Sequence, residues 1–423
     1  MKPIFYLLLL MPYLLLAESF LVSSIPLPKS YVQNMDPLPC DEACLNDLII
    51  HEQIFSFLAH AQGRIEDPEL NDVRLIYVTV FNLGAARESS ELKIALLLPH
   101  RVIGRYAFST TNAVFAYMLA KNRAFEVRTF QIEDESIESI DHALRDMQED
   151  GFYYVIAPVT KQGATHIAQI DPDMSVYFPT INRKDISGAS PSLYFGAIDY
   201  RAQIDTLLQE AVSPLVVFYD QSTLGKELHQ YTRESFVTVD ENPTMFLETD
   251  DEAIEKEVFS YAIGRQTSNL EYQLKGNQKI QYGSFVLNTP IVKSGMVMSQ
   301  LTLYDANATN VLSTQINYDP IIFSMTQYHD RKEMVIANSI GHNNNILVEA
   351  NSLLSNDIVY DWINYATTVG TDLFYHLITR SDREYDLPLE MNQIEYPISL
   401  VKPSLSRFLA YTPTDMEADD PNP

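Results

Sequence analysis

Alternating strand and helix patterns occupy most of the chain after residue 91. Short apolar runs are typical of strands buried on both faces of a parallel sheet, and between them apolar residues recur at helical spacing. This alternation predicts βαβ units with right-handed crossovers. The expected strands are Lys93–Leu98, Phe125–Ile132, Tyr153–Ala157 and Ser175–Phe178. The expected helices are Arg105–Asn122, Ser136–Glu149 and Gly163–Ile170.

A second α/β series follows a break in this rhythm. The segment Leu193–Asp199 is typical of a strand that crosses out of the first series. A long helix, Asp357–Thr379, is expected to return and pack on the first series, whereas the polar stretch 240–281 fits neither pattern. The second series is expected to contain the helices Tyr200–Ala211, Leu224–Phe236 and Gly295–Tyr304, and the strands Leu215–Tyr219, Val311–Ile316 and Glu333–Ala337.

The first 17 residues have the pattern of a secretory signal peptide, with one basic residue followed by an apolar core. A membrane anchor is the alternative, but the run is short and interrupted by Pro12. No later apolar run is long enough to span a bilayer, so no membrane insertion is expected after signal removal. These features predict export.

Residues 18–91 are expected to form an N-terminal arm and a small helix and strand module. Apolar residues recur at helical spacing over Asp41–Gln62, and β-branched and aromatic residues fill Asp72–Phe81, which we interpret as a strand. We favour packing of the helix on its own protein over packing on a partner. At the other end, residues 412–423 are acidic and proline-rich, which predicts a disordered tail.

The chain contains two cysteines, Cys40 and Cys44. In an exported protein they can form a disulfide, although a separation of four residues within a regular helix is poor geometry for one. The bridge therefore requires a distorted helix N-terminus, and two free thiols are the alternative. A metal site is disfavoured, because no histidine cluster lies nearby in the sequence.

Composition narrows the classes of partner. The 423 residues are 46% hydrophobic, which supports sizeable cores, and 29 basic against 56 acidic residues give a net charge of −27. Nucleic acid is therefore an improbable partner, since its recognition requires a basic surface. Dinucleotide-binding, phosphate-binding and nucleophile-elbow motifs are absent, and the nine histidines show no metal-ligand spacing. We expect neither an enzyme nor a bound cofactor or metal.

Four short segments, in their order along the chain, resemble type I periplasmic-binding proteins. The closest subgroup is the activators of penicillin-binding proteins. Leu96–Pro99 with Gly104–Ala107 is similar to the family's first strand and loop, and Tyr154–Val159 is similar to its third strand. Phe195–Asp199 resembles the crossover between lobes, and Val216–Lys226 resembles the entry to the second lobe. The usual serine after the first strand is replaced here by a His-Arg pair.

The resemblance implies a two-lobed α/β fold, with two mainly parallel sheets flanked by helices, a hinge and an interlobe cleft. Together with the signal peptide, it implies a periplasmic location. Residues 92–411 are expected to form this domain, with lobe 1 from about 92–196 plus 357–411 and lobe 2 from about 197–356. In such folds, loops after the carboxyl ends of the strands border the ligand. The candidate ligand-binding residues are His100, Arg101, Arg105, Thr160, Asn182 and Asp220. For each of them we weigh an ordinary surface or interlobe role against a role in binding.

Asn307 lies in an Asn-x-Thr sequence with an acidic residue two positions before it, similar to the extended sequon of bacterial N-glycosylation. Modification requires an exposed loop and a host that owns the transferase.

Two functions compete. The N-terminal module, the unusual first loop and the low glycine count of 14 favour an envelope scaffold that contacts a protein such as a cell-wall synthase. The alternative is a solute-binding protein that closes on a small molecule in the interlobe cleft.

Overall fold

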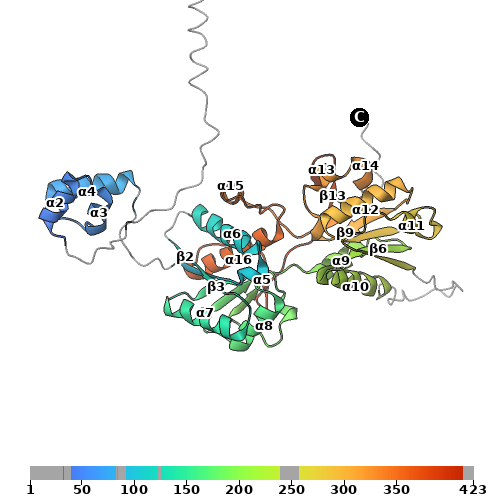
Figure 1. Cartoon of the computed structure of the whole chain (residues 1–423), viewed down its shortest axis with the longest axis horizontal. Coiled ribbons are helices and arrows are strands. Elements are labelled where there is room, and N and C mark those ends of the chain that lie inside the picture. Colours follow the sequence, from blue (N-terminus) through green and yellow to red (C-terminus); the bar gives the residue numbers. More distant parts are fainter. Residues whose placement is uncertain are drawn as a thin grey trace, which may run out of the picture.

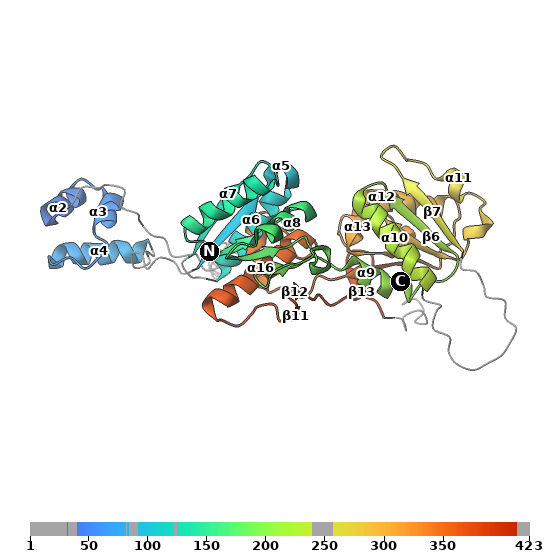
Figure 2. The same ribbon diagram turned by 90° about the horizontal axis from the view of Figure 1, so that it is seen from below.

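A computed structural model describes residues 32, 40–81, 83, 92–121, 125–238 and 257–412. The expected signal peptide, most of the N-terminal arm and the acidic tail beyond residue 412 lie outside these residues. Two seven-stranded sheets form two lobes, with helices on both faces of each sheet (Figures 1 and 2). This arrangement confirms the predicted two-lobed, mainly parallel α/β fold. Within the described residues, no helix combines the length and apolar character needed to cross a membrane.

Lobe 1 contains the first sheet, with strand order β11-β12-β5-β4-β3-β1-β2, in which only the β11–β12 pair is antiparallel. Its strands are β1 (Lys93–Leu98), β2 (Glu126–Gln131), β3 (Tyr154–Ile156), β4 (Ser175–Phe178), β5 (Leu193–Phe195), β11 (Leu389–Glu390) and β12 (Gln393–Ile394). Its helices are α5 (His100–Ile103), α6 (Tyr106–Ala120), α7 (Ile137–Glu149), α8 (Lys161–Ile170), the 3-10 turn η1 (Arg183–Asp185), α15 (Asn345–Leu353) and α16 (Trp362–Thr379).

Strand β1 shows why a continuous apolar run suits this sheet. Ile94 and Leu96 point to the core that contains residues of α6 and α16, whereas Ala95 and Leu97 point to the core that contains residues of α7 and α8. Because successive side chains of a strand alternate between faces, a strand covered on both sides must be apolar at every position.

Lobe 2 contains the second sheet, with strand order β14-β13-β10-β9-β8-β6-β7. Its strands are β6 (Leu215–Asp220), β7 (Val258–Ile263), β8 (Ser284–Asn288), β9 (Asn310–Ser313), β10 (Met334–Asn338), β13 (Ser399–Pro403) and β14 (Phe408–Ala410). Its helices are α9 (Tyr200–Leu208), α10 (Thr223–Thr238), α11 (Glu271–Leu274), η2 (Gln278–Ile280), α12 (Ile291–Leu303), η3 (Gln315–Asn317), α13 (Ile322–Met325) and α14 (Tyr328–Arg331). Helices α9 and α10 cover one face, and α12 covers the other.

The chain crosses between the lobes three times: between β5 and α9, between β10 and α15, and between β12 and β13. Helix α16 packs on α6 and β3, so the long helix returns to lobe 1 as expected. The expected lobe boundaries need correction in two places. Strands β13 and β14 join the second sheet, because β13 pairs antiparallel with β10, so 399–410 do not belong to lobe 1. Helix α15 packs on α6 of lobe 1, although 345–353 were expected in lobe 2.

The described part of the N-terminal module contains three helices around a core of their own, α2 (Glu42–Ile50), α3 (Ile54–His60) and α4 (Pro68–Val80) (Figure 1). The strand expected over residues 72–81 is wrong, because α4 occupies this segment. The Asp67 carboxylate accepts hydrogen bonds from the backbone N–H groups of Glu69 and Leu70, which starts a helix there. The residues that α4 places against the core, Leu70, Val73 and Tyr77, follow a helical period.

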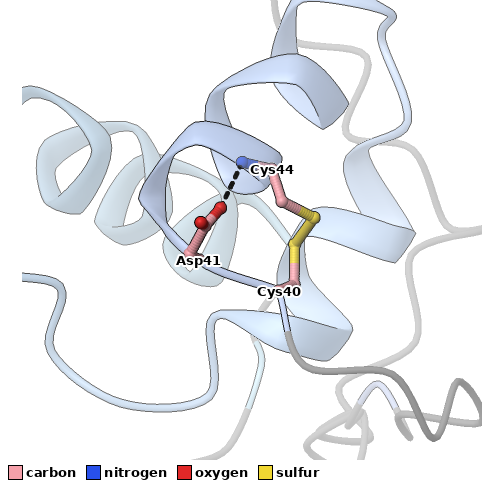
Figure 3. The surroundings of a disulfide bond; sticks show 3 residues. All are labelled: Cys40, Asp41 and Cys44. Atoms are coloured by element: carbon pink, nitrogen blue, oxygen red, sulfur yellow. Dashed lines mark hydrogen bonds between the residues drawn. A yellow bond between two sulfur atoms is a disulfide. The ribbon is translucent and has the colours of Figure 1, made fainter.

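The single helix expected over 41–62 is interrupted between α2 and α3. Glu52 takes a positive φ of 57°, a conformation that ends α2 and redirects the chain. At the start of α2, Cys40 and Cys44 form a disulfide, and the Asp41 carboxylate caps the helix by accepting from the Cys44 backbone N–H at 2.9 Å (Figure 3). Cys40 precedes the helix, so the bridge avoids the poor geometry of two cysteines inside one.

We expect both cysteines of protein taken from an oxidising compartment to resist alkylation until a reductant is added. Intact mass should then rise by two hydrogen atoms on reduction, and by two alkyl groups after reduction and alkylation. The closed loop is short, so the bridge should contribute only about 1–2 kcal/mol to the module's stability. Two thiols that are alkylated without reductant would contradict the bridge.

Tyr177 of β4 lies in a slot between two glycines. A Cβ atom built on Gly196 would lie 1.7 Å from the Tyr177 hydroxyl oxygen, and one built on Gly370 would lie 2.0 Å from its ring. The hydroxyl donates to the Ala366 carbonyl of α16 at 2.8 Å. The two glycines therefore let α16 and the first crossing approach a fully buried tyrosine.

Asp372 of α16 is a fully buried carboxylate that receives several donors. It accepts from the Tyr117 hydroxyl of α6 at 2.7 Å and from the backbone N–H groups of Glu384 and Tyr385 at 2.9 and 3.1 Å. The Arg383 guanidinium lies 3.7 Å away. This network connects α6, α16 and the segment that follows α16 within lobe 1.

Candidate functional site

The candidate residues of lobe 1 follow β1, β3 and β4, on the side that carries α5 and α8. Both helices lie nearer to lobe 2 than α7 does in the two views (Figures 1 and 2). His100 and Arg101 begin α5 and are exposed. Arg101 is paired with Glu133 at 2.9 Å, and both side chains are more than half exposed. This pair is a surface ion pair, which leaves the guanidinium only partly available to an anion.

Arg105 and Tyr106 open helix α6 at the edge that faces the start of lobe 2. The Arg105 guanidinium stacks on the ring of Tyr106, 5.4 Å from its centroid. Burial, helped slightly by the neighbouring Tyr106 phenol, raises the pKa of Tyr200 at the start of α9. Burial also raises the pKa of Asp361, which caps α16, and the charge of Arg105 partly opposes that shift. Arg105 therefore has the Asp361 carboxyl group as a neighbour within lobe 1.

The backbone and hydroxyl donors of Thr160 are bound by the side chain of Glu135. Thr160 is the N-cap of α8, and its backbone N–H donates to the Glu135 carboxylate at 2.8 Å. The Thr160 hydroxyl donates to the other carboxylate oxygen of Glu135. Both donors that were expected to face a ligand therefore bind a carboxylate of the chain itself.

Asn182 and Asp220 stabilise turns. Asn182 is buried and caps η1 by accepting from the Lys184 backbone N–H at 3.1 Å. Asp220 ends β6 and accepts from the Ser222 hydroxyl at 2.7 Å, close to the Cα of Gly225. Within the described residues, neither side chain contacts the other or the candidates on α5, α6 and α8, so their binding role stays a prediction.

An aromatic cluster bridges the lobes. Tyr318, which follows η3 in lobe 2, lies 5.3 Å from Tyr360, which precedes α16 in lobe 1, and 4.6 Å from Phe408 of β14. Burial raises the pKa of Tyr318 to about 12, with smaller contributions from Tyr360 and Asp357. Sequence reasoning missed this cluster, although Tyr318 lies soon after a strand end, the position at which functional side chains are expected.

The carboxyl ends of β8 and β9 carry a buried polar group that was also missed. Asn317 donates to the Ser313 hydroxyl at 2.7 Å and to the Thr289 carbonyl at 3.2 Å. Some buried atoms here lack a protein partner: the Asn288 Oδ1, the Thr314 hydroxyl and the Asn317 Oδ1. Buried polar atoms normally have a partner, so this edge of lobe 2 has unused hydrogen-bonding capacity.

A polar cavity of about 330 Å³ lies beside the N-terminus of α15 on lobe 1. It is lined by His342, Asn344, Asn345, Glu384 and Tyr385. The Glu384 carboxylate accepts from Asn344 at 2.9 Å and pairs with Lys121 at 3.1 Å. None of the residues proposed from the sequence lines this cavity.

The sequon residue Asn307 is exposed in the turn between α12 and β9. Its backbone N–H donates to the Gln281 side chain at 2.9 Å, and the Thr309 hydroxyl donates to the Tyr282 carbonyl at 2.6 Å. The turn is exposed but tied down, and glycosylation stays a prediction. Across the described ranges, no group of His, Cys, Asp and Glu side chains is arranged to hold a metal ion.

Comparison with known proteins supports the fold alone. No protein-family model and no curated protein matches the sequence. Among solved structures, a protein assigned as a branched-chain amino acid ABC transporter from Rhodospirillum rubrum aligns with a TM-score of 0.55 and 10% identity, over 76% of this chain and 99% of its own. The branched-chain amino acid substrate-binding protein LivJ from Streptococcus pneumoniae, in complex with isoleucine, aligns with a TM-score of 0.51 and 9% identity, over 75% and 98%.

An amino acid ABC transporter substrate-binding protein from Pseudomonas fluorescens aligns with a TM-score of 0.52 and 11% identity, over 74% of this chain and 90% of its own. The structural neighbours thus include solute-binding proteins of the type I periplasmic-binding fold. Their similarity lies in the two-lobed body, and at such identities it carries no information on the ligand.

Proposed function

We propose that this chain is a non-enzymatic, exported solute-binding protein that receives a small molecule between its two lobes. The observation that carries the proposal is the arrangement of two sheets joined by three crossings, which is similar to solute-binding proteins over three quarters of the chain. Such a body can close by rotation about its crossings, so that both lobes contact one ligand. We therefore favour binding of a small molecule in the interlobe cleft over the envelope-scaffold function that the sequence favoured.

The charges on the lobe 1 edge favour a neutral or cationic ligand. The net charge of −27 repels anions at long range. Arg101 is paired with Glu133, and Arg105 lies near the Asp361 carboxyl group. The unused acceptors Asn288 Oδ1 and Asn317 Oδ1 on lobe 2 would suit hydroxyl or ammonium donors, provided that closure brings them within reach of the ligand.

Trp362 offers a direct test, because it is the only tryptophan of the chain. It packs 4.7 Å from Tyr396, which lies on the third crossing, and 5.8 Å from Tyr365. Lobe closure should change this environment. We expect a defined set of amino acids, sugars or polyamines both to raise the melting temperature and to shift Trp362 emission.

A Trp362→Phe variant is the matched control, because it should keep the thermal shift and lose the fluorescence change. Binding with no emission change would place the ligand away from the hinge. A broad screen in which no compound alters stability or emission would contradict the proposal.

An envelope interaction protein is the second candidate, and the N-terminal module favours it. Ile50, Phe55 and Ile76 each expose more than half of their surface on a module that otherwise packs around its own core. Exposed apolar residues mark a protein contact when they form one contiguous patch. A photocrosslinking residue at position 55 should capture one defined envelope protein if this candidate is right, and a residue at exposed position 272 in lobe 2 serves as the control.

A further inference from the structure

Glu135 is a buried carboxylate beside the N-terminus of α8, the helix that lies nearer to lobe 2 than α7 does (Figures 1 and 2). Its side chain leaves the loop between β2 and α7, and only 6% of the residue's surface is exposed. One carboxylate oxygen accepts from the Thr160 backbone N–H at 2.8 Å, and the other accepts from the Thr160 hydroxyl. Its backbone carbonyl accepts from the His166 ring Nδ1–H at 2.6 Å, which anchors the loop to α8.

The space that holds this carboxylate depends on a glycine. A Cβ atom built on Gly163, in the first turn of α8, would lie 2.8 Å from the Glu135 carboxyl carbon and 3.0 Å from a carboxylate oxygen. Any larger residue at position 163 would displace the carboxylate, the Val159 side chain or the helix. The first turn of α8 is therefore shaped around a carboxylate group.

The charge of Glu135 is balanced by neutral donors. Within the described part of the chain, no lysine or arginine forms an ion pair with it, and the polar atoms that hold it belong to Thr160 at the N-terminus of a ten-residue helix. Backbone N–H groups at such a helix end favour a negative charge. The nearby Glu133, by contrast, is exposed and paired with Arg101.

We propose that Glu135 is a specificity-determining residue that fills a carboxylate niche with the chain's own side chain. Because the donors of Thr160 are consumed, lobe 1 takes no ligand carboxylate at this edge. The consequence for the ligand, which rests on the proposed solute-binding function, is a molecule that presents a neutral or cationic group to the loop after β3. The niche itself does not depend on that function.

Removal of the carboxylate should leave a vacancy that a small carboxylate can fill. We expect Glu135→Ala to lower the melting temperature by several degrees, and acetate or formate at tens of millimolar to recover at least half of that loss. Chloride at equal ionic strength should recover none of it. Wild-type protein and Glu133→Ala, in which the exposed neighbour is removed, should show no difference between acetate and chloride.

The niche proposal would be overturned if wild type gained as much stability from acetate as Glu135→Ala does, because the donors would then be free. It would also be overturned if folded Glu135→Ala responded to acetate and chloride alike. If this variant folds poorly, its refolding yield in acetate against chloride makes the same distinction. Glu135→Gln, which keeps the shape of the side chain, should fold and show no preference for acetate.

These outcomes are separate from those of the solute screen. Recovery by acetate measures the niche in the absence of any natural ligand. A failed screen with successful recovery would contradict solute binding and leave the role of Glu135 as an internal ligand intact. A successful screen whose best compounds bind through a carboxylate at Thr160 would contradict the niche proposal alone.

Discussion

Replacement of Gly370 by alanine is expected to destabilise lobe 1 by about 3 kcal/mol or more. The new methyl would overlap the Tyr177 ring at 2.0 Å, and both α16 and β4 are fixed by the core around them. This cost should exceed the gain of about 1 kcal/mol that alanine normally brings to a helix interior. Urea unfolding followed by Trp362 fluorescence measures it, since Trp362 lies on the same helix.

Gly295 supplies a matched control, because it is also a buried glycine inside a helix. A Cβ atom there would have its nearest neighbours, Met325 and Thr326, at an ordinary 3.5 Å. Gly295→Ala should therefore be neutral or stabilising by up to about 1 kcal/mol when unfolding is followed by circular dichroism. In Tyr177→Ala, the Gly370→Ala change should lose most of its cost, and fully additive effects would contradict the slot.

Replacement of Asp372 by alanine is expected to lower the free energy of unfolding by about 3–5 kcal/mol, because it leaves several buried donors without an acceptor. The Tyr117 hydroxyl and the backbone N–H groups of Glu384 and Tyr385 would lose their acceptor, and the Arg383 guanidinium would lose its nearby charge. The same fluorescence-detected unfolding in urea measures this loss.

Asp146→Ala is the control for this prediction, since Asp146 on α7 is about half exposed and, within the described residues, its carboxylate pairs only with His142. Its removal should change stability by no more than about 0.5 kcal/mol. Asp372→Asn keeps the size of the side chain and one acceptor oxygen, and should fall between the two. Equal effects of Asp372→Ala and Asp146→Ala would show that the buried network contributes nothing.

Much of the fold was predictable because the buried parallel strands have a clear signal. The expected bounds of β1 and β4 match the structure to the residue. Each apolar run ends where the strand is no longer covered by the helices on both faces of the sheet. The signal failed for α4, where β-branched and aromatic residues suggested a strand. There the Asp67 cap and the helical period of the buried residues decided the conformation. It also failed for β7, which is an edge strand with a half-exposed pattern in a polar part of the chain.

The site was less predictable than the fold. The rule that ligands lie beyond strand ends selected loops that the structure does place after their strands. It could not show which side chains in those loops were already bonded within the chain. Thr160 and Arg101 were correctly placed after their strands, yet their partners Glu135 and Glu133 come from a different loop. The ring contact between Tyr318 and Tyr360 joins residues of different lobes, so no local sequence pattern predicts it.

The three crossings also set the time at which the chain can fold during synthesis. Lobe 1 begins with β1 near residue 93 and is complete only when β12 ends at residue 394, and lobe 2 waits for β14 at residue 410. A ribosome adding about 5–20 residues per second takes about 15–60 s to cover the first of these spans. Throughout that interval both sheets lack strands or helices from their final cores. A nascent chain released at almost any earlier point would therefore contain no finished lobe.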